Sequence, residues 1–193
     1  MTDHKKQNPT VSFDDEKLIL VNPADEVIGY KDKAACHVGE GILHRAFSVF
    51  IFNRHGELLL QQRSALKPLW PLFWSNSCCS HPRKGEDLEI ATQRRLKEEL
   101  GFTTPLKYLF KFQYQARFNE KGSENELCAV LIGKYDHDPV VNDNEIAAWR
   151  WISIDKMEEE METHPEQFTP WFKMEWERIR REHWEDIREL LES

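Results

Sequence analysis

The sequence is short of features that define several protein classes. It contains only four cysteines among 193 residues, and two of them, Cys78 and Cys79, are adjacent. Adjacent cysteines rarely pair with each other, so a disulfide framework is not expected. No apolar run approaches the ~18 residues that span a bilayer. Residues 1–10 carry no apolar stretch behind their basic residues, which argues against a secretory signal. These absences predict a cytoplasmic protein without a membrane segment.

Positive charge is also in short supply. The 26 Lys and Arg residues face 34 Asp and Glu residues, which gives a formal net charge of −8. A general nucleic-acid binder needs a basic face, so we expect no nucleic-acid partner. A small anionic ligand in a local basic pocket is compatible with this charge.

The sequence does have enough apolar material for one core. Hydrophobic residues make up 40% of the chain and aromatic residues 11%. There is no internal repeat and no Pro/Gly-rich linker. At the usual ~150 residues per domain, we expect a single domain over residues 15–193 and an N-terminal extension over residues 1–14.

Hydrophobic patterning predicts a series of strands, at residues 17–21, 46–52, 57–63, 108–118, 124–133 and 148–152. The second and third of these flank a turn and predict a hairpin. Strict alternation from Tyr108 to Phe118 predicts one aromatic face, and alternation also places Glu124 and Glu126 together on one face. Residues 31–45 and 64–86 are predicted to be loops.

Helix signals are found in three places. Residues 87–100 consist of good helix formers and end before Gly101, a typical stop. Ser153 can cap a helix that runs to Met161. The tail from Pro170 onward predicts one long amphipathic helix. Strands, a helix, more strands and then helices predict an α+β fold with a mixed sheet covered by helices.

The first group that can carry chemistry lies on the helix at 87–100. Arg94 precedes Glu98 by one turn, and Arg95 likewise precedes Glu99. Carboxylates near the C-terminal end of a helix are not favoured by its dipole, but they gain if they face a bound cation. A salt-bridged surface helix is the simpler interpretation, and a cation site is the alternative.

The second group consists of histidines and carboxylates, namely His37, His44, His81, Glu124 and Glu126. Three imidazoles and two carboxylates could close most of an octahedral shell around a first-row divalent ion. Each of these histidines alone is more often structural. The metal interpretation therefore depends on the fold bringing the set together.

The stretch from Ser80 to Phe102 resembles the Nudix box, a loop–helix–loop signature that binds a divalent metal and a diphosphate. The matching positions are Glu86, Arg94, Leu96, Glu98, Glu99, Gly101 and Phe102. Ser80 stands where the box has Gly, and Arg95 stands where it has Glu. That Glu normally ligates the metal used for diphosphate hydrolysis. The resemblance therefore implies a branch that binds diphosphate without cleaving it.

A closer resemblance is to the type I isopentenyl-diphosphate delta-isomerase family, over roughly residues 15–175. It rests on the segments 44–50 (HRAFSVF), 58–63 (LLLQQR), 76–82 (NSCCSHP), 94–101 (RRLKEELG), 124–126 (ENE) and 169–172 (TPWF). It implies a Nudix-type α/β/α sandwich with an extra N-terminal strand and C-terminal helices. The implied activity converts isopentenyl to dimethylallyl diphosphate in isoprenoid biosynthesis. The implied partner is a small prenyl diphosphate, and the expected state is a monomer or weak dimer.

The resemblance also implies roles for particular residues. Cys79 and Glu126 would transfer protons, in an order that the sequence leaves open. His37, His44, His81, Glu124 and Glu126 would hold a divalent metal, which could be Mn²⁺, Mg²⁺ or Zn²⁺. Glu99 would help to hold Mg²⁺ bridging to the diphosphate. The substrate would contact Lys33, Arg63, Lys67, Ser80, Tyr114 and Trp171.

Two alternatives remain open at this stage. One is a Nudix hydrolase that cleaves a nucleoside or prenyl diphosphate, against which Arg95 argues. The other is a non-catalytic domain with a structural Zn²⁺. A structural zinc site is closed by four protein ligands, whereas a catalytic site keeps an open position.

Overall fold

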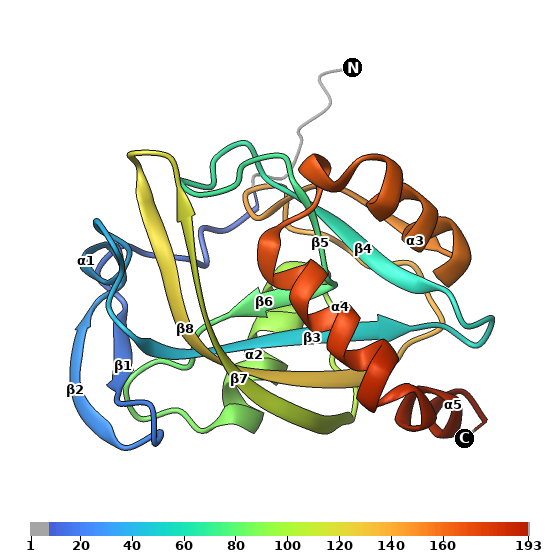
Figure 1. Ribbon diagram of the computed structural model, residues 1–193, viewed down its shortest axis with the longest axis horizontal. Helices are drawn as coiled ribbons and strands as arrows, with labels where there is room; N and C mark the ends of the chain where they lie inside the picture. The colour runs from blue at the N-terminus through green and yellow to red at the C-terminus, as the bar shows by residue number, and fades with distance from the viewer. Residues whose placement is uncertain (1–7, 193) are drawn as a thin grey trace.

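The computed structural model describes residues 8–192 (Figure 1). Its strands form one mixed sheet. They are β1 (Lys17–Val21), β2 (Val27–Asp32), β3 (His44–Phe52), β4 (Leu58–Arg63), β5 (Trp74–Ser75), β6 (Cys78–Ser80), β7 (Leu106–Phe118), β8 (Gly122–Lys134) and β9 (Ile146–Ile152). β3 and β8 run parallel, and β3 pairs in antiparallel fashion with β1, β4 and β6. β3 is therefore the centre on which the other strands are assembled.

Helices cover both faces of this sheet, with α2 behind β3 and α4 in front of it in Figure 1. The helices are α1 (Lys33–Cys36), α2 (Leu88–Leu100), α3 (Ile154–Thr163), α4 (Pro170–Glu182) and α5 (Trp184–Glu192), with a 3₁₀ turn at Pro165–Gln167. No helix within residues 8–192 is long and apolar enough to cross a membrane.

The apolar run of β3 is explained by burial on both faces. Phe47, Val49 and Ile51 pack into the core that contains the apolar residues of α2. Phe50 and Phe52 belong to the opposite core, which contains those of α4. A strand buried on both sides has no polar face, so it reads as a continuous hydrophobic segment. The two cores confirm the predicted α/β/α sandwich and α+β class.

Helix α2 ends before Gly101 as predicted, and it begins one residue later than predicted, because Asp87 is its N-cap. The Asp87 Oδ1 atom accepts a hydrogen bond of 2.8 Å from the backbone N–H of Ile90. Gly101 ends the helix at a φ of 79°, and a Cβ at this position would lie 2.9 Å from the carbonyl oxygen of Val140. Both the left-handed backbone and the close approach require glycine here.

Several predicted loops contain regular structure. The predicted loop at 31–45 includes the end of β2, all of α1 and the start of β3, and the one at 64–86 includes β5 and β6. β2 is an edge strand whose residues are mostly exposed, so it lacks the buried face that alternation reveals. β6 is only three residues long, which is too short for a periodic signal.

The hairpin predicted over 46–63 is correct only at its turn. β3 and β4 pair at Phe52 and Leu58, and β4 then pairs along its length with β9. The predicted aromatic face of β7 is wrong at Tyr108. The register shifts between Tyr108 and Phe110, so Phe110 is buried while Tyr108 is 50% exposed.

The tail is two helices rather than the single long helix predicted. The chain leaves the helical conformation at His183, which has φ −127° and ψ 19°. The His183 ring stacks on Phe110 at a centroid distance of 5.0 Å, and the bend lets Ile187 pack fully buried in the same core. The predicted domain boundaries stay a prediction, because residues 1–7 and 193 lie outside the described residues.

Candidate active site

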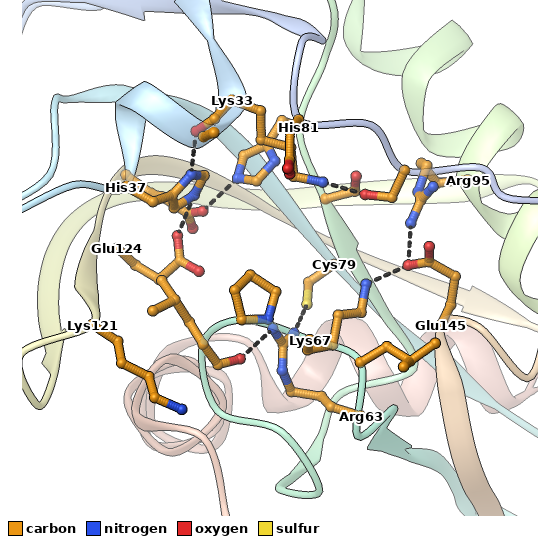
Figure 2. A pocket seen from close by; sticks show the side chains of 18 of the residues that line it. Lys33, His37, Arg63, Lys67, Cys79, His81, Arg95, Lys121, Glu124 and Glu145 are labelled. Carbon is orange, nitrogen blue, oxygen red and sulfur yellow. Dashed lines mark hydrogen bonds and ion pairs between the residues drawn. The ribbon is translucent and has the colours of Figure 1, made fainter.

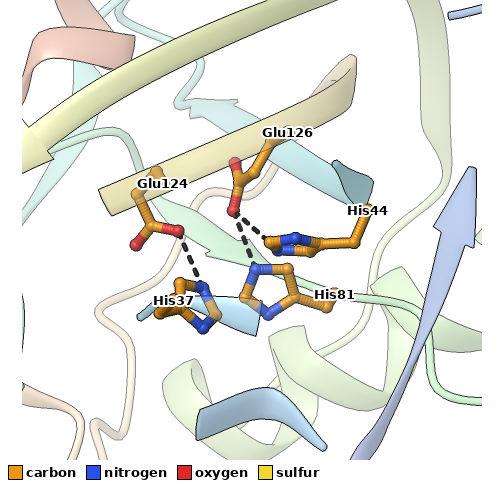
Figure 3. Close-up of side chains that lie close together, drawn as sticks. All are labelled: His37, His44, His81, Glu124 and Glu126. Atoms are coloured by element: carbon orange, nitrogen blue, oxygen red, sulfur yellow. Dashed lines mark hydrogen bonds and ion pairs between the residues drawn. The ribbon is translucent and has the colours of Figure 1, made fainter. Parts of the chain in front are cut away.

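Five metal-ligating side chains meet at one end of β3 and β8 (Figure 3). They are His37, His44, His81, Glu124 and Glu126, and one ligand atom from each lies within 4.8 Å of all the others. His37 follows α1, His44 begins β3, and His81 follows β6, while both glutamates project from β8. The fold thus brings together the whole set that the sequence singled out.

Backbone hydrogen bonds orient two of the three imidazoles. The Nδ1 atom of His37 lies 2.7 Å from the carbonyl oxygen of Lys33, and that of His44 lies 2.6 Å from the carbonyl of Ile42. When Nδ1–H donates to a carbonyl, Nε2 is left with a lone pair for a metal. The His37 Nε2 atom lies 2.8 Å from a Glu124 carboxylate oxygen.

The Glu126 carboxylate lies next to the other two imidazoles. Its Oε1 atom lies 2.8 Å from His81 Nε2 and 3.7 Å from His44 Nε2. His44 is fully buried, and its Nε2 atom has no hydrogen-bond partner among the described residues. A buried polar atom of this kind carries a desolvation cost unless something binds it. A divalent ion at the centre of the cluster would bind it.

Burial and mutual charge shift the pKa values of the cluster. Burial would raise the pKa of Glu126, but the neighbouring His44 and the hydrogen bond from Tyr114 outweigh it and hold that pKa below its usual value. Burial, reinforced by the other two imidazoles, holds the pKa of His81 well below its usual value. A carboxylate that stays ionised and a neutral imidazole are the forms that a metal binds.

The donor set fits a divalent metal. Imidazole nitrogen together with carboxylate oxygen suits first-row ions such as Mn²⁺ and Zn²⁺, and the five donors exceed the four that close a structural zinc site. No cysteine belongs to the cluster. Glu99, which is expected to hold a second ion, lies outside the cluster, and its carboxylate pairs with Arg95.

A cavity of about 460 Å³ opens beside the cluster (Figure 2). Every residue expected to contact substrate lines it, namely Lys33, Arg63, Lys67, Ser80, Tyr114 and Trp171. Cys79 and Glu126, the two expected proton-transfer residues, line it as well. They come from β6 and β8, which pair with opposite edges of β3. The cavity therefore has a thiol and a carboxylate on its wall.

Cys79 lies against a fixed guanidinium. Arg63 donates to the carbonyl oxygens of Leu69 and Trp70 at 2.9 and 3.0 Å, and its Nη1 lies 3.8 Å from the Cys79 sulfur. Burial raises the pKa of the Cys79 thiol to about 12, against the opposing charge of Arg63. The neighbouring Cys78 packs instead into the core beneath α2.

One end of the cavity is cationic. Lys67 and Arg95 both pair with Glu145, and Arg95 also pairs with Glu99. Burial would raise the pKa of Glu145, but Lys67 and Arg95 lower it to about 2. Sequence reasoning missed Glu145, because it lies in a loop before β9 and no periodicity marks it. Lys33 lines the same cavity (Figure 2).

The other end of the cavity is aromatic. Trp171 lies with its ring centroid 5.2 Å from Trp70 and 6.3 Å from Tyr114. The Tyr114 hydroxyl donates to Glu126 Oε2 at 2.5 Å, and Arg63 lies 5.1 Å from the Trp171 ring centroid. Trp70, which packs edge-on against Trp171, lies in a predicted loop and was not identified from the sequence. The cavity thus joins a site for an anion, an acid–base pair and an electron-rich apolar pocket.

Comparisons with known proteins agree with this arrangement. The NUDIX domain family matches residues 42–172. A curated relative from Photorhabdus laumondii, Isopentenyl-diphosphate Delta-isomerase 1, is 41% identical and covers 89% of this chain and 99% of its own length. The Isopentenyl-diphosphate Delta-isomerase of Serratia proteamaculans is 44% identical and covers 82% of this chain and 88% of its own length.

Solved structures show the same fold. DR0079 from Deinococcus radiodurans has a TM-score of 0.64 at 25% identity, and it covers 77% of this chain and 90% of its own. The MutT protein from Methanosarcina mazei has a TM-score of 0.59 at 21% identity, and it covers 72% of this chain and 94% of its own.

Proposed function

The chain belongs to the NUDIX family and to its isopentenyl-diphosphate isomerase branch, and from this premise we propose that it converts isopentenyl diphosphate to dimethylallyl diphosphate. The observation that carries the proposal is the shared cavity, whose wall contains Cys79 and Glu126 together with cationic side chains and the rings of Tyr114 and Trp171. The proposed role of the enzyme is in isoprenoid biosynthesis. Its expected cytoplasmic location and its expected monomeric or weakly dimeric state stay predictions.

The reaction moves a double bond by one position along a five-carbon chain. One proton is added to the terminal methylene carbon, and another leaves the chain carbon on the other side of the tertiary centre. We assign these transfers to Cys79 and Glu126. The pKa of about 12 keeps Cys79 as a thiol at neutral pH, and the lowered pKa keeps Glu126 ionised. The pair then holds one proton, so one group can donate and the other can accept.

The Glu126 carboxylate is held in place from several directions. Tyr114 donates to one of its oxygens at 2.5 Å, and His81 lies 2.8 Å from the other. Fixing an acid–base group within reach of the reacting carbon lowers the entropic part of the barrier. Tyr114 therefore acts as a positioning residue as well as a wall of the cavity.

The tertiary carbon between the two transfers carries positive charge. The Trp171 and Tyr114 rings line the cavity beside it. A cation over an indole face in a desolvated site gains about 2 kcal/mol. We assign the hydrocarbon end of the substrate to this aromatic wall.

The diphosphate belongs at the cationic end. Lys33, Lys67 and Arg95 line it, together with Ser80, which stands at a box position that is normally glycine. Mg²⁺ is bound mainly through phosphate oxygens and few protein ligands, so it enters with the diphosphate as part of the substrate. The expected role of Glu99 toward this ion stays a prediction, and it requires the Glu99–Arg95 pair to open.

The five-residue cluster is the proposed site of the resident divalent metal. A bound ion supplies fixed positive charge beside Glu126, which lowers the proton affinity of that carboxylate. His37, His44 and His81 would hold the ion together with Glu124 and Glu126. We propose Mn²⁺, Mg²⁺ or Zn²⁺, all of which accept parts of this donor set.

Two rival functions are less well supported. A hydrolase needs a metal-binding Glu at position 95, but Arg95 stands there and neutralises Glu99 and Glu145. A structural zinc module would need a closed set of four ligands. The cluster offers five donors beside an open cavity instead.

The proposal is tested by product analysis with labelled isopentenyl diphosphate and added Mg²⁺ and Mn²⁺. An allylic diphosphate ionises readily in acid, whereas the homoallylic substrate does not, so acid-labile label measures the isomerised product. We expect acid-labile label to accumulate without release of inorganic phosphate. Release of phosphate without acid-labile label would identify a hydrolase and contradict the proposal.

A further inference from the structure

Residues 8–14, here called the strap, lie across the cationic end of the cavity. The strap precedes the 42–172 segment that matches the NUDIX family. Thr10, Ser12 and Asp14 line the active-site cavity, whereas Asn8, Pro9 and Val11 line a separate groove beside α2. From Pro9 to Ser12 the two sets alternate, as in an extended chain whose successive side chains face opposite ways. One face of the strap therefore completes the cavity wall.

Side chains of the surrounding fold hold the strap in place. Asn142 donates to the carbonyl of Pro9 at 2.9 Å, and Asn144 donates to that of Asn8 at 2.9 Å. The carbonyl oxygen of Val11 accepts from both Arg83 and Arg95 at 3.1 Å. Arg95 thus binds the strap through one nitrogen and two buried carboxylates through another. The strap is anchored to the residues that form the anion site.

Ser12 is the strap residue that contacts a proposed substrate ligand. The Nζ atom of Lys33 donates to the Ser12 hydroxyl oxygen, and the nearest carboxylate, that of Glu16, lies 3.8 Å away. A hydroxyl accepts through its lone pairs and still has one hydrogen to donate. Within residues 8–192, no acceptor takes that hydrogen.

We propose that Ser12 is a substrate-positioning residue, which orients the Lys33 ammonium and donates its own hydrogen to the diphosphate. The proposal rests on the proposed function for the identity of the substrate. Lys33 lines the cavity with the Glu16 carboxylate 3.8 Å from its Nζ atom, and a diphosphate oxygen would provide a closer counter-ion. In the absence of substrate, the hydrogen bond to Ser12 keeps the Lys33 ammonium at the cavity wall.

The test uses full-length chains with Ser12→Ala and with Ser12→Thr, which keeps the hydroxyl. Calorimetry measures the binding of inorganic pyrophosphate with Mg²⁺, and steady-state kinetics measure KM and kcat for isopentenyl diphosphate. Ser12→Ala removes a hydrogen bond to a charged group, so it should weaken pyrophosphate binding about tenfold or more. KM should rise by a similar factor, while kcat should change less than about twofold. Ser12→Thr should restore both the pyrophosphate affinity and KM.

Ser153→Ala is the matched control, because Ser153 precedes α3 and makes no side-chain cap hydrogen bond there. It should bind pyrophosphate like the unmodified chain. Pyrophosphate affinity that stays within twofold in Ser12→Ala would overturn the proposal, even if the enzyme isomerises its substrate. If Ser12→Ala binds pyrophosphate more weakly but the unmodified chain does not isomerise its substrate, the role of Ser12 in diphosphate binding is supported and the proposed function is refuted.

Discussion

His44 and Glu126 are direct Cα partners in the parallel register of β3 and β8, and His44 Nε2 lies 3.7 Å from Glu126 Oε1. Side chains of register partners project from the same face of a sheet. The backbone pairing of two central strands therefore sets this half of the metal cluster. His81 reaches the same carboxylate from the segment after β6, on the other side of β3.

Replacement of His44 should remove the metal without unfolding the protein. His44→Ala deletes one of five ligands at a fully buried position. We expect the affinity for Mn²⁺, measured by calorimetry, to fall at least about tenfold. The matched control is His164→Ala, at an exposed position outside the cluster, which should bind Mn²⁺ like the unmodified chain. Unchanged Mn²⁺ affinity in His44→Ala would show that the cluster is not the metal site.

Replacement of Cys79 should separate chemistry from metal binding. Cys79→Ala removes a proposed proton-transfer group, so kcat should drop at least about a hundredfold. The bound metal, measured by elemental analysis, should remain. Cys78→Ala is the control, because Cys78 is adjacent in sequence but packs into the core beneath α2. Turnover by Cys79→Ala that matches the Cys78→Ala rate would remove Cys79 from the mechanism.

Arg95 should be important for stability as well as for the anion site. Arg95→Met would leave Glu99, which is 2% exposed, and Glu145, which is 3% exposed, without this partner. Removing one member of a buried ion pair costs about 3–5 kcal/mol. Urea unfolding should show a loss of that order, compared with less than about 0.5 kcal/mol for the exposed Arg181→Met. A loss below 1 kcal/mol for Arg95→Met would contradict this assignment.

The buried carboxyl of Glu175 should make the stability of the protein depend on pH in an unusual way. It is fully buried, accepts from the Cys128 thiol at 3.5 Å, and has a second oxygen without a partner among the described residues. Burial raises its pKa to about 8. Between the ordinary pKa of about 4.5 and pH 8, only the unfolded chain is ionised at this position. The free energy of unfolding therefore falls by about 1.4 kcal/mol for each pH unit by which the pH rises across that window.

Glu175→Gln removes this ionisation. It should leave the melting temperature nearly unchanged at pH 4.5 and raise it progressively up to pH 8. Glu177→Gln, at an exposed position of the same helix, should show no such trend. A melting temperature that is lower than that of the unmodified chain at pH 8 would contradict the assignment.

The sequence predicts those parts of the fold whose burial pattern is simple. β3 is buried on both faces and β8 carries Glu124, Glu126 and Cys128 on one face, so both strands could be identified. β2 is exposed on both faces and gives no alternation, and the bulge beside Phe110 depends on tertiary packing. The break at His183 likewise depends on the packing of Ile187 against the core.

The candidate site follows the same logic. The resemblance named its ligands and cavity residues, and most of them, such as His44, Cys79 and Glu126, lie in the segments that carry it. Glu145 and Trp70 carry no motif, and only the folded chain brings them to Arg95 and Trp171. The strap had no expected role, because its contacts with Arg95 and Lys33 join residues that lie far apart in the sequence.

The most direct test is proton NMR of isopentenyl diphosphate with the purified protein, Mg²⁺ and Mn²⁺ in heavy water. We predict loss of the exocyclic methylene signal, growth of the dimethylallyl signals and uptake of deuterium from the solvent. Deuterium uptake would report both proton transfers. An unchanged spectrum from metal-loaded protein would contradict the proposed isomerisation.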